Sequence, residues 1–198
     1  MYEFNHGEPN NALNIGLGCG ITSKWIADRV NTTTIEIDPV VTETTKYFVK
    51  PFDHNLIIDD GRNWLLRNDQ KFDIIITEPF DPFVNNGGMY TLEYFELLDK
   101  NLSEKGVVAQ WVPNFEFEED DFFILFNTFH KVFPYVYVFQ MEPMSDAQWV
   151  FVGSQNELLI PEEELFLYDQ DDIQERETIL NTDDRPVIEF SVARNIYG

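Results

Sequence analysis

Short apolar runs alternate with segments of helical spacing along the first 155 residues of the chain. The apolar runs are short and rich in β-branched and aliphatic residues, which is typical of strands. The predicted strands span residues 12–15, 32–37, 55–59, 72–77 and 106–112. The predicted helices span residues 22–30, 39–48, 61–68, 91–102 and 118–133. This alternation predicts an α/β fold, in which a mostly parallel sheet carries helices on both faces.

The later part of the chain predicts how this sheet closes. The run 72–77 is too continuously apolar to face water on one side, so it is predicted to be a central, parallel strand. Two further runs, at 135–141 and 149–153, predict a closing antiparallel pair. From residue 161 the chain is acidic, and it is predicted to be partly helical with an edge strand at 185–192. We therefore expect one domain at 1–160 with an appendage of the same domain at 161–198.

The composition supports a folded protein with a real core. Of 198 residues, 43% are hydrophobic and 15% aromatic, so global disorder is not expected. The single cysteine, Cys19, allows no internal disulfide. No apolar run approaches the roughly 18 residues of a membrane span, and the N-terminus lacks a signal-peptide core. A cytoplasmic chain without a membrane segment is predicted, and a longer, membrane-fused parent protein stays compatible with it.

The charge narrows the range of partners. Thirteen basic and 36 acidic residues give a formal net charge of −23. Such a surface repels phosphate backbones, which argues against nucleic acid as a partner, and it attracts polycations. Solubility alone is an equally good interpretation of this charge.

A glycine-rich loop, NIGLGCG, follows the first predicted strand and precedes a predicted helix. Gly16, Gly18 and Gly20 allow positive φ angles and a close approach of a ligand to the backbone. The spacing differs from the G-x-G-x-x-G pattern of NAD sites, because the residue three positions after Gly18 is not a glycine. A G-x-G-x-G loop suits an adenosyl group without a pyrophosphate better.

Acidic residues end three further predicted strands. These residues are Glu36, the pair Asp59-Asp60 and Glu78. Ligands of open parallel sheets bind outside the carboxyl ends of the strands, where neighbouring strands end together. A single acid at such a place is usually a helix cap, but all of them in order predict one crevice for a nucleoside.

The strand 72–77 leaves the sheet through the motif IITEPFDPF, which holds two acids beside two prolines. An alkylamine has a pKa near ~10, so it arrives protonated and needs a carboxylate to orient it and take its proton. Glu78 and Asp81 suit these two tasks, and the prolines stiffen the turn between them. Phe80 and Phe83 offer faces for a cation. The alternative interpretation is a strand-exit turn capped by acids.

The chain resembles the polyamine aminopropyltransferases, the spermidine synthase family, and more closely the spermidine-synthase-like branch often fused to membrane segments. The resemblance runs from about residue 6 to 154, with one phrase in the tail. It is carried by NIGLGCGIT, TIEIDP, DDGRNWL, FDIIITEPFDP, YTLEYFELLDKNLSEKGVVAQWVP and NTDDRPVIEF. The resemblance implies a Rossmann-like class I methyltransferase fold, decarboxylated S-adenosylmethionine or S-adenosylmethionine as co-substrate, a small polyamine acceptor and no metal. A homodimer is a further possibility.

The resemblance also implies a role for each matching position. The loop would pass under the nucleoside, Glu36 would bind the ribose hydroxyls, and Asp60 would bind the adenine amine. Glu78 matches the catalytic acid, and Asp81 matches the acid that holds the amine of the substrate. The implied nucleoside-binding set is Gly16, Gly18, Cys19, Gly20, Glu36, Ile37, Asp60, Gly61 and Glu78. The implied substrate-binding set is Asp81, Tyr90 and Gln110.

Three departures from the family pattern keep other functions open. Cys19 stands where the family has an aspartate for the aminopropyl ammonium, and Glu78 replaces an aspartate. The N-terminal β-hairpin domain of the family is expected to be absent from this chain. An S-adenosylmethionine-dependent N-methyltransferase acting on a small amine is one alternative. A non-catalytic, nucleoside-binding regulatory domain is another.

Overall fold

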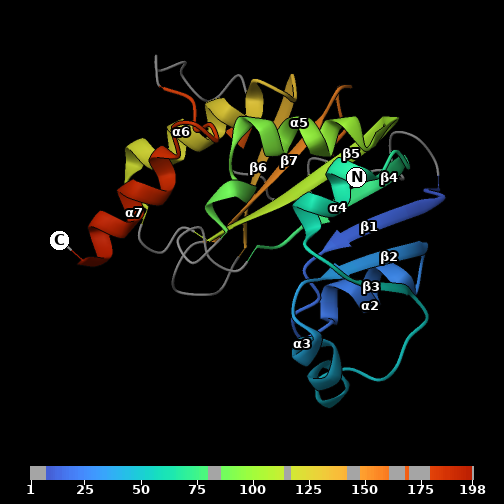
Figure 1. The fold of residues 1–198 in the computed structure, drawn as a ribbon. Helices are drawn as coiled ribbons and strands as arrows, with labels where there is room; N and C mark the ends of the chain where they lie inside the picture. Colours follow the sequence, from blue (N-terminus) through green and yellow to red (C-terminus); the bar gives the residue numbers. More distant parts are fainter. Residues whose placement is uncertain are drawn as a thin grey trace.

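The computed structural model describes residues 8–79, 86–113, 117–141, 148–160, 168–169 and 179–197. These residues form an eight-stranded sheet in the order β3-β2-β1-β4-β5-β7-β6-β8 (Figure 1). The strands are β1 (Asn11–Ile15), β2 (Asn31–Glu36), β3 (Asn55–Ile58), β4 (Phe72–Thr77), β5 (Leu102–Pro113), β6 (Tyr135–Met141), β7 (Gln148–Ser154) and β8 (Tyr168–Asp169). The helices are α2 (Ile21–Ala27), α3 (Pro39–Thr44), α4 (Gly61–Arg67), α5 (Leu92–Lys100), α6 (Glu119–His130) and α7 (Val187–Tyr197), with 3₁₀ turns η1 (Thr45–Tyr47) and η2 (Gly87–Met89).

The parallel half of the sheet runs from β3 to β5, and β4 lies between β1 and β5 as its apolar sequence predicts. Ile15 at the end of β1 pairs with Ile35 on one side and with Thr77 on the other. Thr77 in turn pairs with Gln110 of β5. This register brings the carboxyl ends of β1, β2 and β4 to one edge of the sheet.

The antiparallel part is also confirmed. β7 pairs with β5 and with β6, and the short β8 pairs with β6, all antiparallel. The sheet therefore ends in antiparallel strands on the β5 side, whereas its other edge is the parallel strand β3.

Side chains alternate between the two faces of the sheet along each strand. Both faces therefore carry apolar side chains, and helices cover both. Leu13 of β1 belongs to the large core formed with α4, α5 and α6. Its neighbour Ala12 packs on the opposite face with Ile26 of α2. Figure 1 shows α5 and α6 along one side of the sheet, with α7 beside α6. The predicted class of fold is confirmed.

Residues 187–197 are helical, so the edge strand predicted at 185–192 is wrong. The β-branched content of VIEFSV favoured a strand, but Ile188 and Val192 stand four residues apart and are both fully buried in the core that α6 also enters. This i, i+4 stripe stabilises a helix against the core, and packing outweighs local strand propensity. Phe190, on the other side of α7, is exposed.

Candidate functional site

A cavity of about 370 Å³ opens at the carboxyl ends of β1, β2 and β4. Its lining residues are Ile15, Gly16, Gly18, Ile35, Glu36, Ile37, Val41, Asp59, Asp60, Gly61, Glu78, Pro79, Asn86 and Met89. The structure thus brings together seven of the residues that the sequence predicts for a nucleoside site. Four acidic side chains line the cavity, and no lysine, arginine or histidine is among its described lining residues. Such a lining favours a cationic ligand.

The glycine loop forms the cavity floor beside the end of β4. Gly16 has φ +101°, and a Cβ atom there would lie 3.1 Å from the carbonyl oxygen of Glu78. A larger residue at position 16 would therefore be strained and would push against the backbone that carries Glu78. Gly20, with φ +81°, begins α2, and a Cβ atom there would lie 2.5 Å from Thr45 Cγ2.

Glu36 ends β2 and is nearly buried, with 8% of its surface exposed. Its Oε2 accepts a hydrogen bond from the backbone N–H of Leu17 (2.9 Å), and its Oε1 accepts one from the N–H of Asp38 (2.9 Å). These bonds connect the glycine loop to the start of α3. Each carboxylate oxygen has a further lone pair, so Glu36 can also accept from two neighbouring hydroxyls of a ribose.

Asp60 lies between β3 and α4 and has, besides its place in the cavity lining, the helix-capping task that is usual for an acid at a strand end. Its Oδ1 accepts from the N–H of Asn63 (2.7 Å), which caps α4. Asp59, the preceding acid, also lines the cavity and forms an ion pair with Arg67. The cap fixes the Asp60 carboxylate at the mouth of the cavity, where a second acceptor site is left for a ligand.

We expect Asp60→Asn to raise the dissociation constant of methylthioadenosine by about three- to thirtyfold, measured by calorimetry. Asparagine caps helices as well as aspartate does, so the melting temperature should stay the same. The amide N–H₂ group of the new asparagine would face the amine of adenine, and two hydrogen-bond donors cannot bond to each other. Asp38→Asn is the matched control, since Asp38 caps α3 in the same way. Unaltered affinity in Asp60→Asn would place the adenine elsewhere.

Glu78 follows β4 and faces α2. Its Oε1 accepts a hydrogen bond from the hydroxyl of Thr22 at 3.0 Å. Burial raises the pKa of Glu78 above its ordinary value, and the hydrogen bond from Thr22 opposes this rise only in part. A partly desolvated carboxylate with a raised pKa is a better proton acceptor than an exposed one, which suits a general base.

Asn86 and Met89, at the 3₁₀ turn η2, form part of the cavity wall and were missed by the sequence analysis. Their segment, NNGGMYT, carries a detectable signal, since two glycines precede Thr91, which caps α5. That pattern indicates a turn leading directly into a helix at the edge of the site.

Other predicted site residues lie outside the lining of this cavity. Cys19 is exposed in the loop, and Gly20 lies in the turn that begins α2. Tyr90 is fully buried, and its hydroxyl donates to the carbonyl oxygen of Pro79 at 3.2 Å. Asp81, like the two phenylalanines of its motif, lies outside the described residues.

Gln110 of β5, which pairs with Thr77 at the end of β4, is fully buried. Its Nε2 donates to the carbonyl oxygen of Trp111 (2.9 Å), while its Oε1 has no hydrogen-bond partner among the described residues. A buried amide oxygen without a partner costs free energy, and a donor such as an amine would remove this cost.

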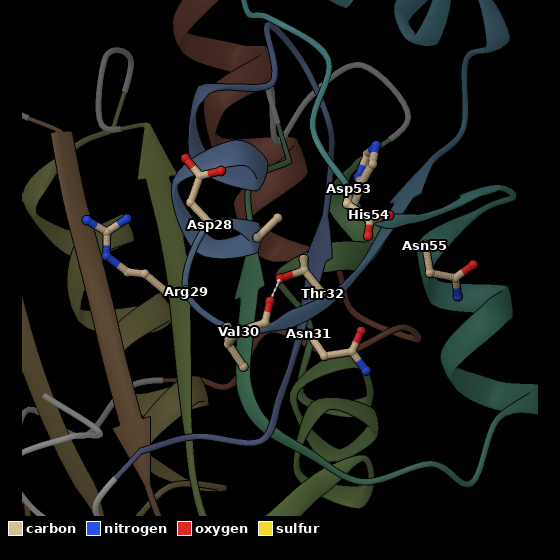
Figure 2. Close-up of a pocket in the computed structure, with 9 residues that line it drawn as sticks. Asp28, Arg29, Val30, Asn31, Thr32, Asp53, His54 and Asn55 are labelled. Carbon is tan, nitrogen blue, oxygen red and sulfur yellow. Dashed lines mark hydrogen bonds between the residues drawn. The ribbon is translucent and has the colours of Figure 1, made fainter.

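A more open cavity of about 600 Å³ lies at the opposite ends of β2 and β3 (Figure 2). Asp28, one of its charged residues, forms an ion pair with Lys24 (2.7 Å), and Arg29 lies over the ring of Trp25. This cavity lacks both the glycine loop and the strand-end acids. The candidate site therefore lies at the carboxyl ends of the strands.

Among the described residues, no helix is long and apolar enough to cross a membrane. The same part of the chain contains no group of three or more histidine, cysteine or acidic residues that could hold a metal ion.

The sheet order and the cavity at its carboxyl edge define the class of protein, which has the class I methyltransferase fold. Residues 2–164 match the model of the spermine/spermidine synthase domain. The chain belongs to this family, as its sequence motifs indicate.

The relatives extend beyond this chain. A polyamine aminopropyltransferase of Sulfurisphaera tokodaii is 30% identical over 165 residues, which cover 76% of this chain and 54% of that protein. The spermidine synthase of Dictyostelium discoideum is 31% identical over 116 residues, or 54% of this chain and 41% of that protein. The chain thus spans about half the length of the curated relatives it matches.

Solved structures show the same fold. The spermidine synthase of Thermotoga maritima matches with a TM-score of 0.61 and 23% identity, covering 77% of this chain and 56% of that one. Human methyltransferase-like protein 13, in complex with SAH, matches with a TM-score of 0.62 and 17% identity, covering 100% of this chain and 86% of that one. These likenesses support the fold alone.

Proposed function

We propose that this chain transfers an aminopropyl group from decarboxylated S-adenosylmethionine to a small polyamine. The observation that carries the proposal is the cavity in which Glu36, Asp60 and Glu78 surround the glycine loop without a basic side chain among the described lining residues. Membership of the spermine/spermidine synthase family supports the same reaction class.

The reaction is a nucleophilic substitution at the carbon next to the sulfonium. The amine nitrogen of the acceptor forms a bond to this carbon, and the carbon–sulfur bond breaks with its electron pair on sulfur, which releases neutral methylthioadenosine. The acceptor nitrogen loses one proton, which Glu78 takes as its general base. In this proposal Asp81 and Gln110 hold the cationic acceptor, and Tyr90 holds the backbone carbonyl of Pro79, next to Glu78.

The electrostatics of the cavity favour a donor without a carboxylate. S-adenosylmethionine carries a carboxylate that would need a basic partner, and the described lining offers four acids in its place. Like charges brought together at a binding site are costly. Decarboxylated S-adenosylmethionine is cationic throughout and avoids this repulsion.

Cys19 favours an S-adenosylmethionine-dependent N-methyltransferase as the second candidate function. This exposed residue stands where a family aspartate would hold the aminopropyl ammonium of the donor, so the loop itself does not select that group. The third candidate is a nucleoside-binding domain without turnover, which the sequence analysis also leaves open. We further propose that the protein acts in the cytoplasm, forms a homodimer and holds no resident metal.

Calorimetric titration with two donors and two products tests these functions. The compounds are decarboxylated S-adenosylmethionine, S-adenosylmethionine, methylthioadenosine and S-adenosylhomocysteine. We expect the decarboxylated donor and methylthioadenosine to bind at least about tenfold more tightly than their carboxylate-bearing counterparts. The reverse order would favour methyl transfer, and donor binding without turnover across a panel of polyamines would favour the non-catalytic domain.

A further inference from the structure

The C-terminal residues 179–197 follow the matched family domain at 2–164, yet they contact the segment 87–92, which adjoins the cavity-lining residues Asn86 and Met89. Asn181 is the first of these contacts and is 99% buried, with 1% of its surface exposed. Its Nδ2 donates to the carbonyl oxygen of Tyr90 (2.8 Å), and its own carbonyl accepts from the N–H of Leu92 (2.8 Å). Its Oδ1 accepts from the N–H of Ile188 in α7 (3.2 Å). Asn181 therefore joins α7 to the segment that follows η2.

Asp183 makes a second connection to the same segment. Its Oδ1 accepts from the hydroxyl of Thr91 (2.7 Å), and its Oδ2 forms an ion pair with the guanidinium of Arg62. Arg62 also donates to the carbonyl oxygen of Gly88, within η2, and directly follows Gly61 of the cavity lining. One carboxylate from the tail thus connects the starts of α4 and α5 with η2.

The charge state of Asp183 agrees with this contact. Partial burial by itself raises the pKa of Asp183, but the hydrogen bonds from Arg62 and Thr91 and the charge of Arg62 outweigh it. The net pKa is lowered, so the carboxylate stays ionised and able to accept both bonds at neutral pH.

Helix α7 also packs directly on η2. A Cβ atom at Gly87 would lie 2.5 Å from the carboxylate oxygen of Glu189 and 3.1 Å from its Cβ. Two consecutive glycines give this turn unusual backbone freedom, so its conformation depends on contacts with other elements. In this structure the tail contacts this turn at Gly87 and contacts the residues directly after it.

We propose that Asn181 and Asp183 are positioning residues that hold residues 86–91 where Asn86 and Met89 form a wall of the nucleoside cavity. The tail of this chain is then part of the binding site through its hold on η2, although it does not line the cavity. The identity of the ligand rests on the proposed function, whereas the hold on η2 does not.

Asp183→Asn tests this role, with Asp184→Asn as the matched control. Asp184 is the neighbouring aspartate, which is exposed like Asp183, and the same unit of charge is removed there. Hydrogen exchange of residues 86–92 in the free protein reports the hold on η2, and calorimetry with methylthioadenosine reports the cavity. We expect Asp183→Asn to speed exchange of the Met89 and Tyr90 amides several-fold and to weaken methylthioadenosine binding by about three- to tenfold. Asp184→Asn should match the unmodified protein in both measurements.

Unchanged exchange at 86–92 in Asp183→Asn would overturn the proposal, and so would faster exchange with unchanged affinity. Arg62→Gln removes the same ion pair from the other side and should change exchange in the same direction. Equal melting temperatures of the two aspartate variants would show that the effect is local. If the unmodified protein bound no methylthioadenosine, the proposed function would fail, while the exchange measurement would still decide the hold on η2.

Discussion

Glu78→Gln is expected to lower the rate of aminopropyl transfer by about 10²–10⁴-fold while leaving the affinity for methylthioadenosine nearly unchanged. Glutamine has almost the same shape, and its amide oxygen can still accept the hydrogen bond from Thr22. It cannot accept the proton that the acceptor amine must lose. The rate is measured as the release of methylthioadenosine with a saturating polyamine, and the affinity by calorimetry.

The pH dependence gives the same prediction a second readout. Burial raises the pKa of Glu78, so its carboxylate is protonated at a higher pH than an exposed glutamate would be. Only the ionised form acts as a base, so transfer should decline as the pH falls through this raised pKa and should be fully present above it. The residual activity of Glu78→Gln should lack this acid limb.

Glu104→Gln is the control for Glu78, because Glu104 is an exposed glutamate on β5 and is not part of the cavity lining. It should transfer at the rate of the unmodified protein. If Glu78→Gln turned over equally fast, Glu78 would have no part in the proton transfer, and the base would have to be sought elsewhere around the cavity.

The sequence predicted correctly those features of the fold and site that depend on the residue pattern of single strands. The apolar run ending at Thr77 predicted a central strand, and parallel strands that end at one edge predicted that Glu36, Asp60 and Glu78 would meet. These inferences depend on local periodicity and on the general geometry of parallel sheets. Both can be derived from the chain without knowledge of long-range contacts.

The remaining features depend on partners that are distant in sequence. Arg62 and Asp183 are 121 positions apart, and nothing in either local pattern indicates the other. The helix at 187–197 exists because Ile188 and Val192 find a core surface that local propensity does not encode.

Glu36→Gln is expected to raise the dissociation constant of methylthioadenosine by about ten- to a hundredfold. The Glu36 carboxylate accepts from two backbone N–H groups at once, one from Leu17 and one from Asp38. Glutamine has one amide oxygen, so in either orientation its N–H₂ group must face an N–H donor. With 8% of the side chain exposed, water cannot easily replace the lost bond.

Loss of the Glu36 carboxylate lowers the affinity for the ligand in two ways, whereas loss of a purely structural residue would act only through the loop. The glycine loop loses a fixed contact at Leu17, and the ribose loses an acceptor for one of its hydroxyls. Glu43→Gln, on the exposed side of α3, is the matched control and should bind as the unmodified protein does. An adenine-containing ligand without ribose hydroxyls should lose less affinity in Glu36→Gln than methylthioadenosine does. Equal losses for both would assign the whole effect to the loop, and an unchanged dissociation constant would remove the ribose from this end of β2.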